Sequence, residues 1–492
     1  MIRSEHWEVQ VRELRFAIIG AGMSGVLAAI KLFEAGYRDV GLYEKAERLG
    51  GTWRENTYPG IACDVPSHLY SYSFEPNPGW SHHYSPGNEI QAYFERVARK
   101  HGVEARIRFG QEVTRADWRG GRWELETAKG VRDSADVVIA ATGVLHHPNL
   151  PDIPGLSSFA GACFHSARWN HSTTLDGKRV GVVGTGSTAV QIVTALVERV
   201  AKLSLFQRTA QWVLAQTNPP YTDAERTDFA RDPDSLATMR ANMSQLFSDT
   251  FSNAVVDANS AMIKMIEEQC RANLESNVRD PELRERLRPS YRAACKRLVI
   301  SPNFYQAIQH PNAELVTSGI ERVEPKGVRT KDGRLHELDV LVLATGFRAD
   351  RFMRPTRVTG RDGVSLDDVW AKRPSAYLSI SIPGFPNLFM LNGPNGPVGN
   401  FSLIEVAELQ MAYILQLVES LRDGRAREIS ASAPASVEFE RARSEAAKGA
   451  IWSTGCKSWY LDDRGIPASW PWTFDRFREE MARPKLEAYE RS

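Results

Sequence analysis

Short apolar runs alternate with helix-like segments along most of the chain. Residues 14–19 and 180–183 are rich in β-branched side chains, and each run leads into glycines and then into a segment of helical periodicity. Two further runs, residues 136–143 and 339–347, are near copies that share an Ala-Thr-Gly turn. Strands that alternate with helices are typical of parallel sheets covered by helices. The pattern predicts an α/β protein with two Rossmann-like domains.

The repeated Ala-Thr-Gly turns also predict where one domain gives way to the other. Each turn follows short strands with turn signals, so we expect both units to close in the same way. Residues 146–161, rich in Pro and Gly, predict a linker. We therefore expect a first domain over residues 1–147, a second over 148–340, and a return to the first over 341–492. That last part includes a long helix that begins near Leu403.

Residues 220–292, inside the second domain, lack a strand pattern and predict a helical insert. Apolar side chains recur there at helical spacing, at Met239, Met243, Leu246, Phe247 and Phe251. Such a stripe favours a face that packs on a core. A helical roof over a substrate pocket is the alternative, and methionines suit either role.

Composition excludes several classes of function. The 492 residues include 61 basic and 60 acidic ones, so neither nucleic acid nor an anionic membrane is an expected partner. The charged N-terminus predicts no signal peptide, and no apolar run is long enough for a membrane segment. The cysteines, Cys63, Cys163, Cys270, Cys295 and Cys456, form no CxxC pair. We expect reduced thiols in a cytoplasmic protein, with neither a redox dithiol nor a metal site.

Two glycine-rich segments follow the first strand of each predicted unit. They are Gly20-Ala-Gly22-Met-Ser-Gly25 and Gly184-Thr185-Gly186-Ser187-Thr188-Ala189. Turn glycines let the backbone approach a pyrophosphate, and the following helix N-terminus offers free N–H groups. One such motif is weak, but two in the right context predict two dinucleotide sites.

The residue that reads the adenosine ribose differs between the two sites. Glu44 follows Gly25 by 19 residues, and Arg208 follows Ala189 by the same number. A carboxylate at this place accepts hydrogen bonds from ribose hydroxyls and repels a 2′-phosphate. A guanidinium favours that phosphate. We therefore predict FAD in the first site and NADPH in the second.

Two longer motifs carry a resemblance to a known family. Residues 159–169 fit F-x-G-x-x-x-H-x-x-x-W through Phe159, Gly161, His165 and Trp169, and residues 50–64 fit G-G-x-W-x(4)-[FY]-P-G-x(3)-D. Over nearly its whole length the chain resembles the type I Baeyer–Villiger monooxygenases. One departure is Asn170, where that family usually has Pro or Asp after the tryptophan.

The resemblance implies an enzyme that uses FAD, NADPH and O₂ to insert one oxygen beside a ketone carbonyl. The product is an ester or lactone, formed through a C4a-peroxyflavin. Arg297 would stabilise the peroxide anion and the oxyanion of the adduct. Asp64 would orient Arg297 beside the flavin. A surface or phosphate-pairing role for Arg297 is the alternative reading.

The resemblance also assigns residues around the cofactors. Thr52, Trp53 and Tyr70 would line the FAD, with Asp64 and Arg297 near the flavin ring. Lys296 would join Arg208 and Thr209 around the 2′-phosphate of NADPH. His165 would couple the domains rather than act as a general base. The aromatic stretch over residues 451–472 would be either a lid over the pocket or an anchor.

Three other functions share the two nucleotide sites. A flavin monooxygenase that oxidises nitrogen or sulfur centres has a fingerprint without a tryptophan at the place of Trp169. An NADPH-dependent flavin reductase needs a redox dithiol or a docking surface for its partner. A regulator that senses NADPH would consume no O₂. The sequence specifies neither the ketone nor the oligomeric state.

Overall fold

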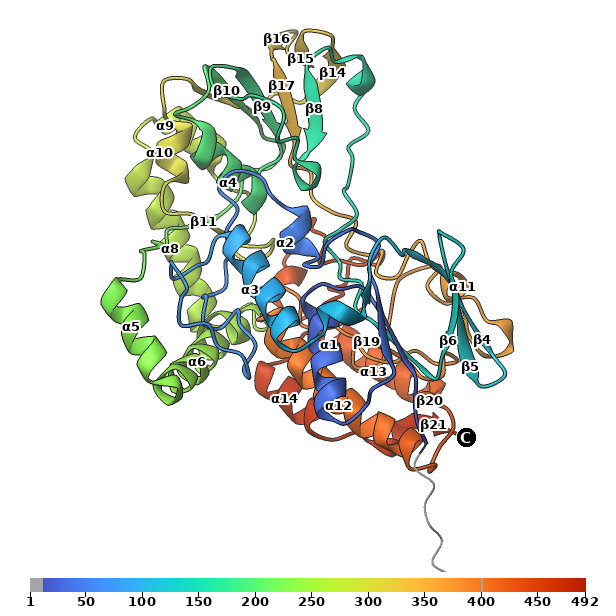
Figure 1. The fold of residues 1–492 in the computed structure, drawn as a ribbon. Helices are drawn as coiled ribbons and strands as arrows, with labels where there is room; N and C mark the ends of the chain where they lie inside the picture. The colour runs from blue at the N-terminus through green and yellow to red at the C-terminus, as the bar shows by residue number, and fades with distance from the viewer. Residues whose placement is uncertain (1–11, 400) are drawn as a thin grey trace, which may run out of the picture.

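The computed structural model describes residues 12–399 and 401–492 (Figure 1). Residues 1–11, the charged N-terminal stretch from which no signal peptide was expected, lie outside the described part. The first unit is built on a parallel five-stranded sheet in the order β19-β7-β1-β2-β3. The strands are β19 (Leu388–Met390), β7 (Val137–Ala140), β1 (Phe16–Ile19), β2 (Val40–Tyr43) and β3 (Ile107–Arg108). Because β19 comes from the C-terminal third, the first unit is discontinuous in sequence.

The second unit repeats this arrangement. Its parallel sheet has the order β8-β17-β9-β10-β13, with β8 (Ala162–His165), β17 (Val340–Leu343), β9 (Arg179–Val183), β10 (Lys202–Phe206) and β13 (Ala313–Val316). In both sheets the strand that leads into the glycine-rich turn, β1 or β9, lies between the closing strand and the second strand of its unit. The predicted α/β fold with two repeated units is confirmed.

Each sheet is covered on both faces. The helices α1 (Met23–Glu34), α3 (Gly87–Lys100), α12 (Leu403–Arg422) and α14 (Phe474–Ala482) share the first apolar core. Trp118 and Trp123 pack on the opposite face of that sheet with Ala17 and Ile19 of β1. In the second unit, α4 (Ser187–Leu196) and α10 (Phe304–Ile308) pack on the sheet. Because both faces are covered, the strands read as apolar runs.

Small sheets precede both closing strands, as expected. One is antiparallel over β4 (Val113–Arg119), β5 (Arg122–Thr127) and β6 (Arg132–Ala135), with β18 (Arg357–Thr359) parallel to β4. The other comprises β14 (Ile320–Glu324), β15 (Gly327–Thr330) and β16 (Leu335–Glu337). The remaining pairs are β11 (Val213–Leu214) with β12 (Val299–Ile300), and β20 (Ile429–Ala431) with β21 (Tyr489–Arg491).

The two connections between the units run side by side. An antiparallel bridge pairs Pro148 with Phe347, and the Asn149 N–H donates to the Gly346 carbonyl at 2.8 Å. Since β17 ends at Leu343 inside the second sheet, we propose that the chain returns to the first unit just after this residue. Apart from this shift of the second boundary, we propose the division into residues 1–147, 148–340 and 341–492.

The insert is helical, with α5 (Asp223–Arg231), α6 (Pro233–Phe247), α7 (Asn253–Val255), α8 (Ala261–Asn277) and α9 (Pro281–Leu287). The prediction that the apolar stripe packs on a core is wrong for Leu246, because this side chain is 64% exposed. A polar contact helps to fix α6 instead, because the buried Ser244 hydroxyl donates to Glu405 of α12 at 2.8 Å. Apolar spacing alone could not reveal this contact, since its partner lies on a distant helix.

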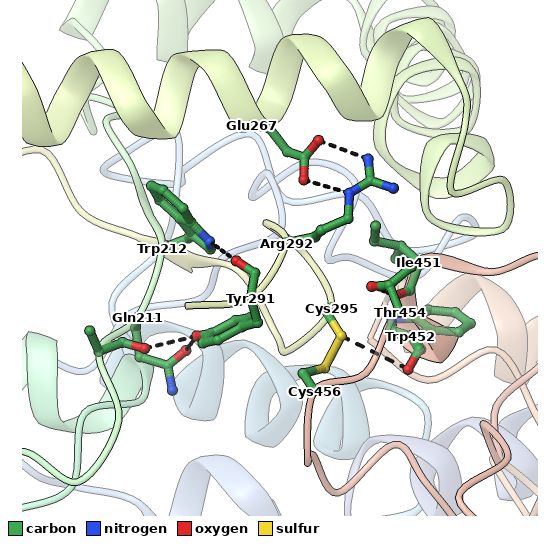
Figure 2. Close-up of a disulfide and its surroundings, with 11 residues drawn as sticks. Gln211, Trp212, Glu267, Tyr291, Arg292, Cys295, Ile451, Trp452, Thr454 and Cys456 are labelled. Atoms are coloured by element: carbon green, nitrogen blue, oxygen red, sulfur yellow. Dashed lines mark hydrogen bonds and ion pairs between the residues drawn. A yellow bond between two sulfur atoms is a disulfide. The ribbon is translucent and has the colours of Figure 1, made fainter. Parts of the chain in front are cut away.

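The disposition of the cysteines corrects one expectation. Cys295 and Cys456 form a disulfide, with 6.1 Å between their Cα atoms (Figure 2). The prediction that all five thiols are reduced is therefore wrong for this pair. Spacing could not show the bond, because the two cysteines are 161 positions apart and meet only where the C-terminal segment folds back. Within residues 12–399 and 401–492 there is no potential metal-binding cluster and no helix able to span a membrane.

A buried histidine connects the insert to the first unit. His68 is 2% exposed, and its ring lies 5.3 Å from that of Tyr221 and 4.8 Å from that of Phe229. Its Nε2 has no hydrogen-bond partner in the described structure. Burial, reinforced by the charge of His83, lowers the pKa of His68 to about 4.

We expect His68 to make the fold sensitive to acid. Because its folded pKa of about 4 lies below the unfolded value of about 6.5, the unfolded chain takes up the proton first. The stabilising contribution is present above about pH 6.5 and is lost as pH falls towards 4. His68→Phe, which cannot be protonated, should reduce the loss of unfolding free energy between pH 7 and 4 by about 1–3 kcal/mol in urea titrations. Equal losses in the two proteins would contradict this role.

Candidate active site

A cleft opens where β1 meets the first glycine-rich turn. Of the residues predicted to hold FAD, Gly20, Gly22, Glu44, Thr52, Trp53 and Tyr70 line this cleft. Gly25 and Asp64, also predicted to bind FAD, do not line the cleft. The sequence-predicted set is thus brought together from the first turn, the end of β2 and the segment that contains α2 (Thr52–Glu55).

Two glycines of the first turn, Gly20 and Gly25, leave no room for side chains. Gly20 has φ +102°, and a Cβ there would lie 2.5 Å from the Ala141 carbonyl oxygen. A Cβ at Gly25 would lie 1.9 Å from the Gly20 carbonyl oxygen. Gly25 therefore serves the close packing of helix on strand, while Gly20 keeps backbone at the cleft surface. This cradle fits a dinucleotide.

We expect Gly25→Ala to disturb the cleft. The added methyl has no room against the Gly20 backbone, and such overpacking costs about 1–3 kcal/mol. The variant should unfold at lower temperature and be purified with less flavin, as measured by the ratio of visible to protein absorbance. Gly186→Ala is the matched control, because no heavy atom lies within 4 Å of its added Cβ. Equal flavin content and stability in both variants would contradict the prediction.

Glu44 is fixed in place by three donors. Its carboxylate accepts hydrogen bonds from the N–H groups of Ala21 at 3.0 Å and Ala46 at 2.9 Å, and Arg54 pairs with it at 2.9 Å. Glu44 and Arg54 are both largely buried. The predicted ribose-reading carboxylate is thus held rigidly at the end of β2. Sequence reasoning missed Arg54, although it lies within the motif of residues 50–64.

The sequence also gave no sign of the cleft wall that comes from the last third of the chain. Asn392, Val398 and Leu403 line the cleft. The Asn392 side-chain amide donates to the Ser24 hydroxyl at 3.1 Å, which joins this loop to the start of α1. The Gly- and Pro-rich segment before the long helix predicted a loop there, but it did not show that this loop contacts the first glycine-rich turn.

The second glycine-rich turn repeats the first. Gly184 has φ +122°, and a Cβ there would lie 2.2 Å from the Ala344 carbonyl oxygen. Gly186 precedes α4, whose first residues are the predicted Ser187, Thr188 and Ala189. The Thr185 hydroxyl donates to the Thr209 carbonyl at 2.7 Å, which ties the turn to the segment after β10. Arg208 lies in that segment.

Two cations come together beside this turn. The pKa of Lys296 is lowered by burial and then by the charge of Arg208, so the two side chains lie near one another. Among the described residues, no carboxylate forms a salt bridge with either cation. Two adjacent positive charges without an acidic partner suit a phosphate ligand. The second site therefore fits NADPH rather than NADH.

Arg297 and Asp64, predicted to act together, form an ion pair. The guanidinium donates from Nε at 3.1 Å and from Nη2 to the same oxygen, Oδ2 of Asp64. The charge of Asp64 is the main reason that the pKa of Arg297 is raised. Both charges also influence the pKa of Tyr70, which lines the flavin cleft. A permanent cation is thus held beside the cleft.

The loop that carries Arg297 is braced on several sides (Figure 2). The Trp212 indole N–H donates to the Tyr291 carbonyl at 2.6 Å. Arg292 forms a two-point ion pair with Glu267 of α8, at 2.8 and 2.9 Å. The disulfide at Cys295 attaches the same loop to the C-terminal segment. Arg297 therefore extends from an ordered loop.

The fingerprint residues lie where the two units are connected. His165 accepts the Ala167 N–H at Nδ1 and donates from Nε2 to the Gly346 carbonyl at 3.0 Å, so its ring is neutral. Burial lowers the pKa of His165, in keeping with this arrangement. A Cβ at Gly161 would lie 2.3 Å from the Asp339 carbonyl oxygen.

Two aromatic residues and Asn170 complete the fingerprint region. Phe159 packs on a small core of the second unit, and Trp169 meets Phe164 edge-to-face with 5.0 Å between ring centroids. Asn170, the departure from the family pattern, accepts the Ser172 N–H at 3.1 Å and its hydroxyl at 2.7 Å. Asn170 thus closes a local turn on the surface.

Comparison with known proteins identifies the family. Residues 13–353 match the family described as flavin-binding monooxygenase-like. A Baeyer–Villiger monooxygenase of Streptomyces coelicolor is 39% identical over 99% of this chain and 94% of its own. An uncharacterized monooxygenase of Mycobacterium tuberculosis is 47% identical over 96% of this chain and 95% of its own. The crystal structure of cyclohexanone monooxygenase from Rhodococcus sp. Phi1 bound to NADP⁺ has a TM-score of 0.87 at 30% identity, covering 97% of this chain and 99% of that chain.

One dinucleotide cleft and a second glycine-rich turn of the same form, on paired α/β units, are the features of a two-cofactor flavoprotein. With these matches, the chain belongs to the flavin-binding monooxygenase-like family, and within it to the type I Baeyer–Villiger monooxygenases. The findings favour this class over a flavin monooxygenase that oxidises nitrogen or sulfur centres.

Proposed function

We propose that Arg297, oriented by Asp64, is the catalytic cation of this FAD- and NADPH-dependent Baeyer–Villiger monooxygenase. The net reaction converts ketone, O₂, NADPH and a proton into ester or lactone, water and NADP⁺. The observation that carries the assignment is the Arg297–Asp64 ion pair, which lies near Tyr70 of the flavin cleft. The substrate we propose is a small-molecule ketone.

The described residues divide between the two cofactors. We assign FAD to the cleft lined by Gly20, Gly22, Glu44, Thr52, Trp53 and Tyr70. NADPH is assigned to the turn of Gly184 and Gly186 at the start of α4, with its 2′-phosphate at Arg208, Thr209 and Lys296. Bound FAD, once reduced by NADPH, supplies the activation of O₂.

Arg297 acts on charge that develops during oxygen insertion. A ketone carbonyl oxygen becomes negative when the carbonyl carbon is attacked, and a fixed cation stabilises that charge. The raised pKa of Arg297 keeps the guanidinium protonated throughout the working pH range. Asp64 holds the guanidinium by two contacts and so limits its motion.

His165 has a different role in this proposal. Both ring nitrogens are engaged with backbone groups, which leaves neither free for proton transfer to substrate. One of these groups, Gly346, belongs to the connection between the units. We assign His165 to conformational coupling, in which the nicotinamide-bearing unit moves relative to the flavin-bearing unit.

A ketone panel tests the reaction class. The purified enzyme is given NADPH, ¹⁸O₂ and linear, cyclic and aryl ketones, and products are analysed by mass spectrometry. We expect an ester or lactone that carries one labelled oxygen at carbon, with NADPH consumed in equal amount. A sulfide and an amine are tested in parallel. Oxidation of these compounds without any ketone product would refute the proposal, as would NADPH oxidation that gives only hydrogen peroxide with every ketone.

A further inference from the structure

Tyr460 is buried beside the Arg297 loop although it belongs to the C-terminal segment. It is 3% exposed, and its ring lies 5.3 Å from that of Trp452. The same apolar cluster contains Ala294 and Leu298, which flank Arg297 in sequence. The C-terminal segment is therefore packed directly against the loop that carries the catalytic cation.

The Tyr460 hydroxyl lies close both to Arg297 and to a segment that lines the flavin cleft. The phenol helps to raise the pKa of Arg297, and the charge of Arg297 acts against the effect of burial on the pKa of Tyr460, so the two groups lie close together. A Cβ at Gly399 would lie 2.1 Å from this hydroxyl, so the oxygen packs directly against the Gly399 backbone. The preceding residue, Val398, lines the cleft. This hydroxyl is thus near the guanidinium and near the cleft wall.

The disulfide holds this arrangement together. Cys295 lies two residues before Arg297, and Cys456 lies four residues before Tyr460. The Trp452 carbonyl oxygen is 3.9 Å from the Cys295 sulfur, which shows how closely the two segments approach (Figure 2). A covalent bond so near both side chains restricts the separation of the two segments.

We propose that Tyr460 is a positioning residue for Arg297, presented by a C-terminal segment that the Cys295–Cys456 disulfide fastens to the Arg297 loop. This inference rests on the proposed function, because it matters only if Arg297 is the catalytic cation. Asp64 engages the guanidinium through a single oxygen, which leaves the plane of the group weakly fixed. Tyr460 supplies a second acceptor from another part of the chain and so fixes that plane. Burial raises the pKa of Tyr460, so the phenol is neutral and acts on the guanidinium as a neutral acceptor.

Tyr460→Phe tests the proposal because it removes only the hydroxyl. We expect NADPH to reduce the flavin at the wild-type rate, and the ratio of ester to hydrogen peroxide to fall about tenfold, as expected for loss of a hydrogen bond to a charged group. The peroxide arises when NADPH, a proton and O₂ give NADP⁺ and H₂O₂ without oxygen insertion. Tyr413→Phe is the matched control, since its buried hydroxyl pairs with that of Tyr489 at 3.0 Å in the first core. This control should keep the wild-type ratio.

Cys456→Ser provides a second route to the same result. Releasing the C-terminal segment should lower the ester-to-peroxide ratio in the same direction. Combined with Tyr460→Phe it should add little, because both changes act on one contact. A wild-type ester-to-peroxide ratio in folded Tyr460→Phe enzyme overturns the proposal. If Tyr460→Phe fails to fold, a wild-type ratio in Cys456→Ser overturns it instead.

Arg297→Ala distinguishes this proposal from the proposed function. Normal ester formation by Arg297→Ala would mean that the proposed function itself has failed. Normal ester formation by the Tyr460 and Cys456 variants alone would mean that only the positioning role has failed.

Discussion

Replacing Arg297 with alanine should abolish ester formation while NADPH continues to reduce the flavin. The guanidinium is paired with Asp64 and is near enough to Tyr70 of the flavin cleft for its charge to affect the pKa of that phenol, and no other described cation shares that carboxylate. Loss of one group that stabilises a developing oxyanion typically lowers the rate by about 10²–10³-fold. Stopped-flow reduction of the flavin and product yield by mass spectrometry separate the two steps.

The charge and the geometry of Arg297 can be tested separately. Arg297→Lys keeps a cation but cannot donate from two nitrogens of one rigid plane, so we expect a product yield between those of the wild type and the alanine variant. Wild-type yield in Arg297→Ala would refute the catalytic assignment. A parallel loss of flavin reduction and ester would instead indicate that the substitution disturbs the cofactors.

Replacing Arg208 with alanine should remove most of the preference for NADPH over NADH. Arg208 and Lys296 lie together beside the second glycine-rich turn, and no acidic partner pairs with either in the described structure. Loss of a charge-assisted contact to the 2′-phosphate should lower kcat/KM for NADPH about 10–100-fold. The value for NADH should change little, because NADH lacks that phosphate. Steady-state kinetics with both nucleotides measure the ratio.

Arg199→Ala is a suitable control for this experiment. Arg199 lies in the same unit but forms an exposed ion pair with Asp176 at 2.8 Å. Its replacement should leave both kinetic constants near wild type, since exposed ion pairs contribute about 0–1 kcal/mol. Equal losses for NADPH and NADH in Arg208→Ala would show a general disturbance of the site rather than recognition of the phosphate.

Residues close in sequence were predicted well because local geometry requires them. Gly20 and Gly184 both adopt positive φ where the strand turns into the helix, and only glycine tolerates that backbone without strain. Glu44 was placed correctly because parallel strands of regular length bring the end of β2 beside the turn. Leu246 was placed wrongly because apolar spacing cannot distinguish a packed stripe from an exposed one.

By itself, the sequence determined the repeated α/β units, the two dinucleotide sites and the class of enzyme, since strand periodicity, turn glycines and short motifs act over a few residues. Only the tertiary structure decided that the C-terminal segment joins Asp64 at the Arg297 loop. The family resemblance already paired Asp64 with Arg297, but it did not place Cys456 or Tyr460 there, because neither spacing nor propensity encodes such contacts. They follow from packing of the C-terminal segment against the Arg297 loop, where burial of Trp452, Tyr460 and Leu298 in one core brings the pieces together.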